Sequence, residues 1–285
     1  MLQNLVKLMR PKHYVKNGLI FAPLIFSGQL LVADNFLRIL VSVLIFSLVA
    51  SVVYIINDIR DVEKDRKHPK KKDRPIASGA VSIQQALILL AIIIAIVIVI
   101  IIIMPLNLTS IVILAVYLAI NIGYSFGLKN IPVVDIAILA AGFVIRVLYG
   151  GDVVDIDVSN WLYLTVLAGA FYVSLGKRRN EIVVNGVKSR KVNEFYTVNF
   201  LDKFMYVCLA LLLTFYSLWA TDSVSGGHES LFWTIPIVIL LCMTYSLHIE
   251  KEGSMGDPVD VLFGNKVLLV FVAVYIALTT YILYV

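Results

Sequence analysis

Residues 57–79 combine acidic and basic side chains in a chain that is otherwise mostly apolar. The stretch reads N-D-I-R-D-V-E-K-D-R-K-H-P-K-K-K-D-R-P-I-A-S-G, and its first half carries Asn57, Asp58, Asp61 and Asp65. If the preceding apolar helix continues through them, Asn57, Asp61 and Asp65 drift by only about 40° per step, and Asp58 lies within the same arc of about 100°. The four side chains would then face one way over roughly two turns. Such oxygen ligands suit Mg²⁺, which usually takes one or two carboxylates together with substrate phosphates. The spacing therefore predicts a Mg²⁺ site shared with a diphosphate, with these four residues as ligands and the three aspartates as catalytic residues.

The second half of the stretch is basic and follows a predicted helix end at His68-Pro69, because a residue before proline disfavours helical backbone. Arg66 and Arg74 are expected to meet the remaining phosphate charge. A solvated loop that only contacts lipid headgroups is the plainer interpretation, but such a loop does not need the acids. The cation site of a transporter is another alternative, although its acids would lie nearer the bilayer midplane than a helix end.

The rest of the chain has the composition of a membrane protein. Of its 285 residues, 60% are hydrophobic and 15% are charged, and the mean hydropathy is +0.92. Soluble domains average about 25% charged residues, and a membrane-crossing helix needs roughly 20 apolar residues. The sequence therefore predicts an all-α integral membrane protein with about nine spans in a single domain, residues 1–285. The predicted spans lie at about 17–33, 36–57, 82–104, 107–126, 132–150, 160–177, 203–221, 231–249 and 265–284.

Basic residues gather in loops on one side of these spans. They precede the first span and fill the second-to-third and sixth-to-seventh loops, whereas the opposite loops hold several acids and a single basic residue, Arg38. By the positive-inside rule the N-terminus and both long charged loops are cytoplasmic. The distribution indicates anionic headgroups rather than nucleic acid as the partner of the net positive charge, and Arg190 is expected to contact headgroups. We expect a multi-pass protein of the cell membrane with its active site on the cytoplasmic face.

The acidic motif also resembles a known family signature. Asn57-Asp58-x-x-Asp61-x-x-x-Asp65, followed by Asp73-Arg74-Pro75-x-x-Ser78-Gly79, is similar to the first signature of the UbiA superfamily of intramembrane prenyltransferases. The resemblance implies a bundle of nine helices and use of Mg²⁺ in the loss of diphosphate. The second signature of that superfamily is also rich in aspartate, but the corresponding stretch here, residues 176–182, reads G-K-R-R-N-E-I. This loop is basic and carries one acid.

Four motifs narrow the resemblance to one branch of the superfamily. R-P-K-x-x-V-K-N at 10–17, the acidic motif, L-K-x-x-P-x-x-D at 128–135 and G-K-R-x-x-E at 176–181 closely resemble decaprenyl-phosphate phosphoribosyltransferases. That branch implies phosphoribosyl pyrophosphate as donor, a decaprenyl-type polyprenyl phosphate as acceptor and diphosphate as leaving group. The reaction would be a step in the synthesis of lipid-linked pentose donors for cell-envelope polysaccharide. The donor carries a 5-phosphate in addition to its diphosphate, and the lipid acceptor carries a phosphate of its own. Lys and Arg in the second loop are suited to bind these two groups.

The remaining substrate-binding residues come from these motifs and from two neighbouring stretches, Tyr124-Ser125 and Gly142–Arg146. They are Lys16, Asn17, Tyr124, Ser125, Lys129, Asp135, Arg146, Lys177, Arg178 and Glu181. Arg146 lies inside a predicted span, where an arginine usually faces the bundle interior. Glu181 is expected to orient a basic group or a ribose hydroxyl.

Several of these residues have simpler alternatives. Lys16 and Lys129 also fit as positive-inside anchors, Asp135 as a first-turn partner of the helix dipole, and Tyr124 and Ser125 as packing groups. The rival activities are prenyl transfer from a prenyl diphosphate to an aromatic or glyceryl acceptor, and transport. The sequence leaves open the polyprenyl chain length, the path of the lipid tail and whether the chain forms a homo-oligomer.

Overall fold

A computed structural model describes residues 2–67, 71–222, 229–250 and 257–285, and throughout these ranges the regular elements are helices. The predicted all-α class is confirmed. Seven segments of the described chain are long and apolar enough to cross a membrane. They are α3 (Ala33–Arg60), α5 (Ile83–Ile103), α6 (Leu108–Phe126), α7 (Val134–Val153), α9 (Val198–Thr221), Ser230–Glu250, which contains α10 (Ile235–Glu250), and α12 (Lys266–Tyr284).

Two of the nine predicted spans take other forms. The apolar stretch 17–33 is divided between a 3₁₀ helix, η1 (Pro11–Phe21), and a short helix, α2 (Ala22–Phe26). Pro23 stands in the first turn of α2, and Gly28 has a φ of 73°, so the stretch cannot continue as one helix. The stretch 160–177 lies in α8 (Asn160–Asn185), which is 26 residues long but less apolar than the seven spans. The count of nine stays a prediction.

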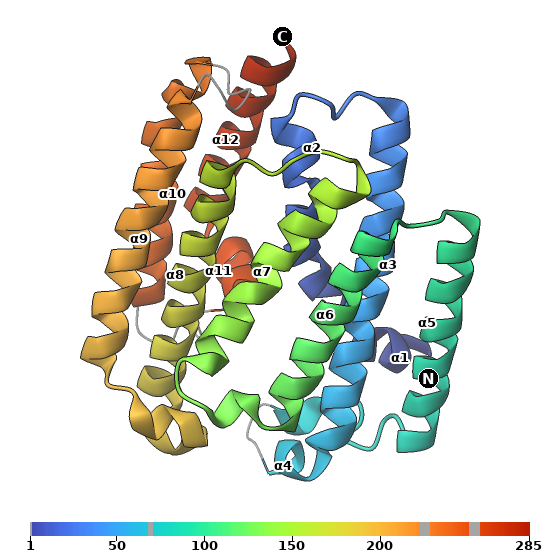
Figure 1. Ribbon diagram of the computed structural model, residues 1–285. Helices are drawn as coiled ribbons and strands as arrows, with labels where there is room; N and C mark the ends of the chain where they lie inside the picture. Colours follow the sequence, from blue (N-terminus) through green and yellow to red (C-terminus); the bar gives the residue numbers. More distant parts are fainter. Residues whose placement is uncertain (1, 68–70, 223–228, 251–256) are drawn as a thin grey trace.

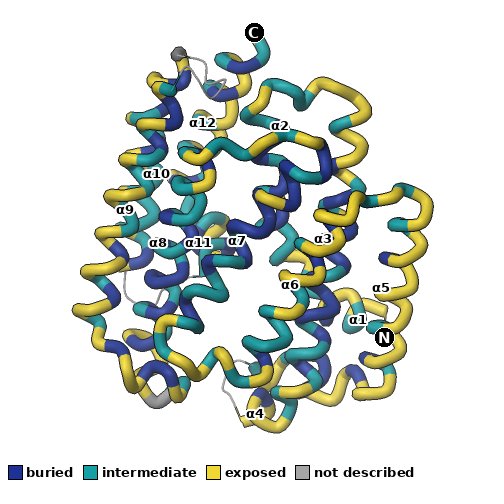
Figure 2. Tube along the Cα trace, viewed as in Figure 1, coloured by how far each residue is buried: buried dark blue, intermediate teal, exposed yellow. Residues whose placement is uncertain are grey.

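The helices form a bundle around α3 and α7 (Figure 1). In the most apolar 18-residue segment of α3, and likewise of α7, 61% is buried inside the protein. The corresponding share in α5 is 11%. Figure 2 shows the consequence, because α5 at one edge of the bundle is largely exposed while α3 carries many buried positions. Since the exposed residues of α5 are mostly Ile, Leu and Val, this helix is suited to face lipid rather than water.

A glycine allows the closest backbone approach in the bundle interior, where η1 crosses α7. A Cβ at Gly150 would lie 2.0 Å from the carbonyl oxygen of Ile20, which is backbone and cannot rotate away. The crossing brings Asn17, one turn earlier in η1, against Arg146, one turn earlier in α7, and the two are hydrogen-bonded. Gly150 therefore helps to set the position of a predicted site residue.

Gly150→Ala is expected to destabilise the protein by about 1–3 kcal/mol or more, because overpacking against backbone forces the two elements apart. Thermal unfolding of the purified protein in detergent measures the effect. Gly18→Ala is the matched control, since a Cβ there meets nothing within 4 Å. Equal unfolding midpoints for the two variants would contradict the close approach.

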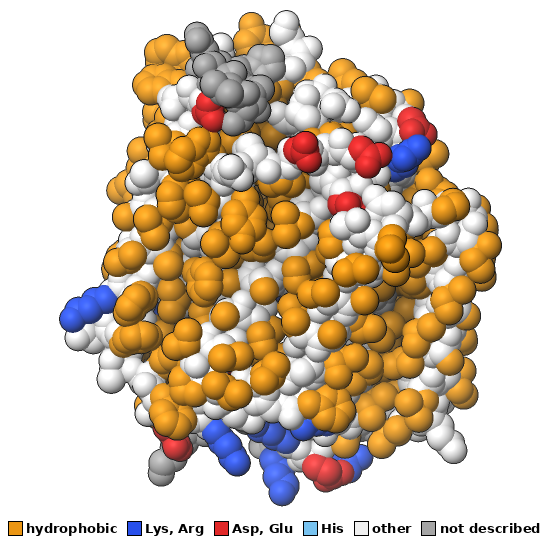
Figure 3. Space-filling model, in the orientation of Figure 1, with side chains coloured by type: hydrophobic (Ala, Val, Ile, Leu, Met, Phe, Trp, Pro, Cys, Tyr) orange, Lys and Arg blue, Asp and Glu red, His pale blue; other side chains and the backbone are white. Residues whose placement is uncertain are grey.

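Charged groups collect at the ends of the bundle. In Figure 3 a broad apolar belt covers the visible face, and most of its Lys and Arg side chains gather at the lower end. That end holds α4 (Val62–Arg66), and the chain between α6 and α7 turns there through η3 (Leu128–Asn130) (Figure 1). The connection from α8 to α9 also lies at that end and holds η4 (Val187–Ser189) and η5 (Lys191–Phe195) (Figure 1). Both long charged loops thus contribute to one end of the molecule.

Candidate active site

The acidic motif lies where α3 gives way to α4. Asn57 and Asp58 belong to the last turn of α3, Asp61 lies at the junction, and Asp65 is in α4. Helical hydrogen bonds continue across the junction, from Asp61 N to Asn57 O at 2.9 Å and from Asp65 N to Asp61 O at 2.8 Å. The predicted continuation of the helix is thus interrupted at Asp61 but keeps much of its frame. The helix end expected at His68-Pro69 falls outside the described residues, and α4 ends at Arg66.

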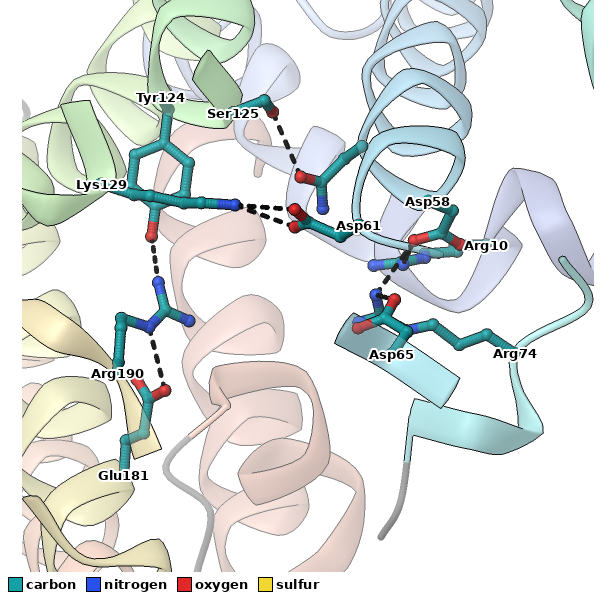
Figure 4. Close-up of polar contacts among 11 residues, drawn as sticks. Arg10, Asp58, Asp61, Asp65, Arg74, Tyr124, Ser125, Lys129, Glu181 and Arg190 are labelled. Atoms are coloured by element: carbon teal, nitrogen blue, oxygen red, sulfur yellow. Dashed lines mark hydrogen bonds and ion pairs between the residues drawn. The ribbon is translucent and has the colours of Figure 1, made fainter. Parts of the chain in front are cut away.

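Two of the carboxylates share one arginine (Figure 4). Nη1 of Arg74 lies 3.0 Å from Oδ1 of Asp58 and 2.6 Å from Oδ2 of Asp65. Arg10 adds a second cation, with its Nη2 2.5 Å from the same Asp58 oxygen. The side chains of Asp58 and Asp65 are only 2% and 5% exposed. Burial of two carboxylates at this depth requires cationic partners, and Arg10 and Arg74 supply them.

The other two members of the motif face the α6–α7 turn. Lys129 places its Nζ 2.8 Å from Oδ2 of Asp61, and Ser125 donates a hydrogen bond of 3.2 Å to Oδ1 of Asn57. Figure 4 shows Lys129 reaching across to Asp61 while Asp58 and Asp65 point towards Arg74. The structure therefore brings Lys129 and Ser125, predicted from one stretch of the chain, together with Arg74 around the acidic helix end. Arg66 is not among them, because it pairs with exposed Glu63 at 2.7 Å and contacts the carbonyl of Ala77.

The donor set at this helix end fits Mg²⁺. The four oxygen-bearing side chains do not all face one way, as the helical spacing predicted, because the helix is interrupted at Asp61. Asp58 and Asp65 reach the same guanidinium nitrogen of Arg74, whereas Asp61 and Asn57 face the α6–α7 turn. Among the described residues no group of three or more His, Cys, Asp or Glu side chains is placed to hold a metal ion by itself. An open arrangement suits Mg²⁺, which completes its coordination with substrate phosphates and water.

A second polar network joins the basic loop to the α6–α7 turn. Arg190 donates to the hydroxyl of Tyr124 at 2.8 Å and to Glu181 at 3.1 Å (Figure 4). Glu181 also pairs with Arg178, which is 2% exposed, and Nη2 of Arg178 lies 2.5 Å from Oδ2 of fully buried Asp135. These contacts use both carboxylates to hold Arg178 in the interior. Arg190, expected at lipid headgroups, is instead part of this network.

A third cluster was missed by the sequence analysis. Asp257, just before α11 (Pro258–Gly264), accepts from Lys16 at 3.2 Å and from Lys177 at 2.9 Å, both on Oδ2. Burial alone would raise the pKa of the Asp257 carboxyl, but Lys177 and Lys16 hold that pKa below its ordinary value. The signal in the sequence was the Asp-Pro pair of a helix start, which also marks many ordinary caps.

Arg146 lies in the bundle interior as predicted, with 5% of its surface exposed. Its Nε donates to Oδ1 of Asn17 at 2.8 Å, and Asn17 in turn donates to Ser47 at 2.8 Å. The guanidinium also lies over the rings of Phe46 and Tyr117, at 4.9 and 5.3 Å from their centroids. Nη1 of Arg146 also donates to the carbonyl of Gly142. An amide, a carbonyl and two ring faces thus stabilise this buried cation.

Lys16 gives the site an expected pH dependence. Burial and the neighbouring Lys177 lower the pKa of Lys16 from 10.5 to about 8, with Arg146 acting in the same direction and Asp257 opposing; His13 also lies near. The ammonium is charged below that pKa and neutral above it. If Lys16 binds a substrate phosphate, the KM for that substrate rises as pH increases through about 8. Lys16→Arg removes this alkaline limb because arginine stays charged, and an unchanged limb in the variant would exclude Lys16 as its source.

Comparisons with known proteins agree along nearly the whole chain. The model of the UbiA prenyltransferase family matches residues 20–254. A decaprenyl-phosphate phosphoribosyltransferase of Mycolicibacterium smegmatis is 33% identical, covering 94% of this chain and 88% of that protein. One of Corynebacterium glutamicum is 30% identical, covering 95% and 84%. Among solved structures, a UbiA homolog from Archaeoglobus fulgidus bound to GPP and Mg²⁺ has the same fold, with a TM-score of 0.71 at 17% identity and coverage of 98% and 99%.

Proposed function

This chain belongs to the UbiA prenyltransferase family, and from that premise we propose that it is a multi-pass membrane phosphoribosyltransferase. It transfers the 5-phosphoribosyl group of phosphoribosyl pyrophosphate to a polyprenyl phosphate and releases diphosphate. The observation that carries the proposal is the similarity to proteins named decaprenyl-phosphate phosphoribosyltransferase. They are 30–33% identical to this chain along at least 94% of its length. The single transferase unit spans the whole chain and works at the cytoplasmic face of the cell membrane, where its basic loops lie by the positive-inside rule.

The arrangement of charges supports this choice of substrates. An acidic helix end and a basic loop are joined through the α6–α7 turn, because Lys129 pairs with Asp61 and Tyr124 with Arg190. A diphosphate with its metal belongs at the acidic side. A separate sugar phosphate needs fixed cations, and Arg190, Lys129 and Arg74 offer them nearby. An aromatic prenyl acceptor would carry no such phosphate.

In the proposed reaction an oxygen of the polyprenyl phosphate attacks C1 of the ribose while the bond from C1 to the diphosphate oxygen breaks. The acceptor phosphate is already ionised near neutral pH, so no side chain has to remove a proton from it. Asn57, Asp58, Asp61 and Asp65 would hold Mg²⁺, which takes up charge on the departing diphosphate. Arg74 and Lys129 lie beside those carboxylates and would contact the phosphates of the donor. Arg178 would position Glu181 and Asp135 from its buried site.

The test is a transfer assay in detergent with radiolabelled phosphoribosyl pyrophosphate and polyprenyl phosphate. Label is expected to enter the organic phase only when Mg²⁺ and the lipid phosphate are both present. The competing prenyltransferase activity is tested in parallel with a prenyl diphosphate and aromatic or glyceryl acceptors. Prenyl transfer without phosphoribosyl transfer would overturn the proposal.

A further inference from the structure

An apolar cavity of about 440 Å³ lies between α7, α8, α9, α10, α11 and α12. Its lining is almost entirely hydrocarbon and aromatic, with Leu241, Leu262 and Val272 contributed by three different helices. The volume falls within the usual range of small-molecule sites, about 300–1,000 Å³. The acidic helix end contributes nothing to this lining. The cavity is therefore separate from the proposed diphosphate site.

The Lys16–Lys177–Asp257 cluster is connected to this cavity through the elements that line it. Each of its members is followed or preceded closely by a lining residue: Leu19 three positions after Lys16, Val173 one turn before Lys177, and Pro258 directly after Asp257. The three charged groups come from η1, α8 and the start of α11, which all converge there. Cationic groups thus border an apolar space, which is the arrangement that an amphiphile with an anionic head requires.

The cluster has a net positive charge that can bind a phosphate. Two ammonium groups share the single oxygen Oδ2 of Asp257, so one positive charge is left over. The other oxygen, Oδ1, accepts a hydrogen bond of 3.1 Å from the backbone N of Val259 and anchors the carboxylate to α11. Asp257 is therefore suited to hold both lysines in place, and a phosphate monoester, with a charge of about −1.5 to −2 near pH 7, complements them.

We propose that this is the acceptor site: the phosphate of the polyprenyl phosphate binds Lys16 and Lys177, and the first isoprene units of its chain enter the apolar cavity. Asp257 is a positioning residue for the two lysines. The inference rests on the proposed function and assigns the two substrates to different cations. Lys129, Arg74 and Arg190 serve the water-soluble donor, while Lys16 and Lys177 serve the lipid.

Equilibrium binding of radiolabelled decaprenyl phosphate to the purified protein in detergent tests the site without depending on catalysis. Lys177→Ala and the cavity-filling Leu262→Trp are each expected to weaken binding by about tenfold or more. Arg179→Ala is the matched control, because it removes a cation from the same turn of α8 that pairs instead with Asp202 at 3.0 Å. It is expected to bind the lipid like wild type. Val272→Trp fills the cavity from α12, so a local fault in α11 cannot account for the result.

The transfer assay then separates this inference from the proposed function. In Lys177→Ala the KM for the lipid should rise while the KM for phosphoribosyl pyrophosphate stays within about twofold. If the wild-type protein shows no phosphoribosyl transfer but binds decaprenyl phosphate, and the variants lose that binding, the site is supported and the proposed function is rejected. Transfer with an unchanged lipid KM in Lys177→Ala, Leu262→Trp and Val272→Trp would overturn the site. A higher KM for phosphoribosyl pyrophosphate alone in Lys177→Ala would also overturn it.

Discussion

Asp61→Asn is expected to lower Mg²⁺-dependent phosphoribosyl transfer by about 100-fold or more, because it removes a carboxylate charge from the proposed metal–diphosphate site. Of the three aspartates Asp61 is the best probe. Its side chain is 22% exposed and pairs with Lys129, whereas Asp58 and Asp65 are buried and hold Arg10 and Arg74 in place. Initial rates across a Mg²⁺ titration measure the effect, and the apparent Mg²⁺ constant should rise.

Two further variants distinguish a metal role from a purely local ion pair. If Asp61 served only to neutralise Lys129, then Asp61→Asn with Lys129→Met would recover activity. With Asp61 on the metal and Lys129 on a substrate phosphate, the double variant is expected to be slower than the single one. Glu63→Gln is the control, because Glu63 is 76% exposed and pairs with Arg66. Near-normal Mg²⁺-dependent transfer by Asp61→Asn would rule out Asp61 as a metal ligand.

Arg178→Met is expected to cost about 3–5 kcal/mol of stability, because it leaves the buried carboxylate of Asp135 without its cation. Asp135 is fully buried, and its remaining side-chain partner among the described residues is Tyr196, which donates a hydrogen bond of 2.6 Å. Chemical unfolding in detergent measures the loss. Combining Arg178→Met with Asp135→Asn should recover part of the lost stability, because the asparagine amide leaves no unpaired charge in the interior.

Arg179→Met is the neighbouring control for that measurement. Its partner Asp202 is 32% exposed, so water can solvate the carboxylate after the change, and a loss below about 1 kcal/mol is expected. If both variants unfolded alike, the buried pair would not be holding α7 and α8 together.

Several features could be predicted because they depend on neighbours along the chain. Long apolar runs became the helices α3, α5 and α12. The four-residue spacing of Asn57, Asp61 and Asp65 survived because helical hydrogen bonds continue across the α3–α4 junction. The stretch 17–33 was harder, since hydropathy alone does not register the effects of Pro23 and Gly28 on backbone geometry.

The sequence by itself determined that this protein crosses a membrane, that it belongs with the UbiA prenyltransferases, and which charged side chains stand at its helix ends. Tertiary structure alone decided how those charges are paired. Asp61 meets Lys129 across 68 residues, and Asp257 meets Lys16 across 241. The physical reason is that helical periodicity sets the direction of a side chain around its own axis. The group it meets depends on how distant helices pack, and no local pattern specifies that.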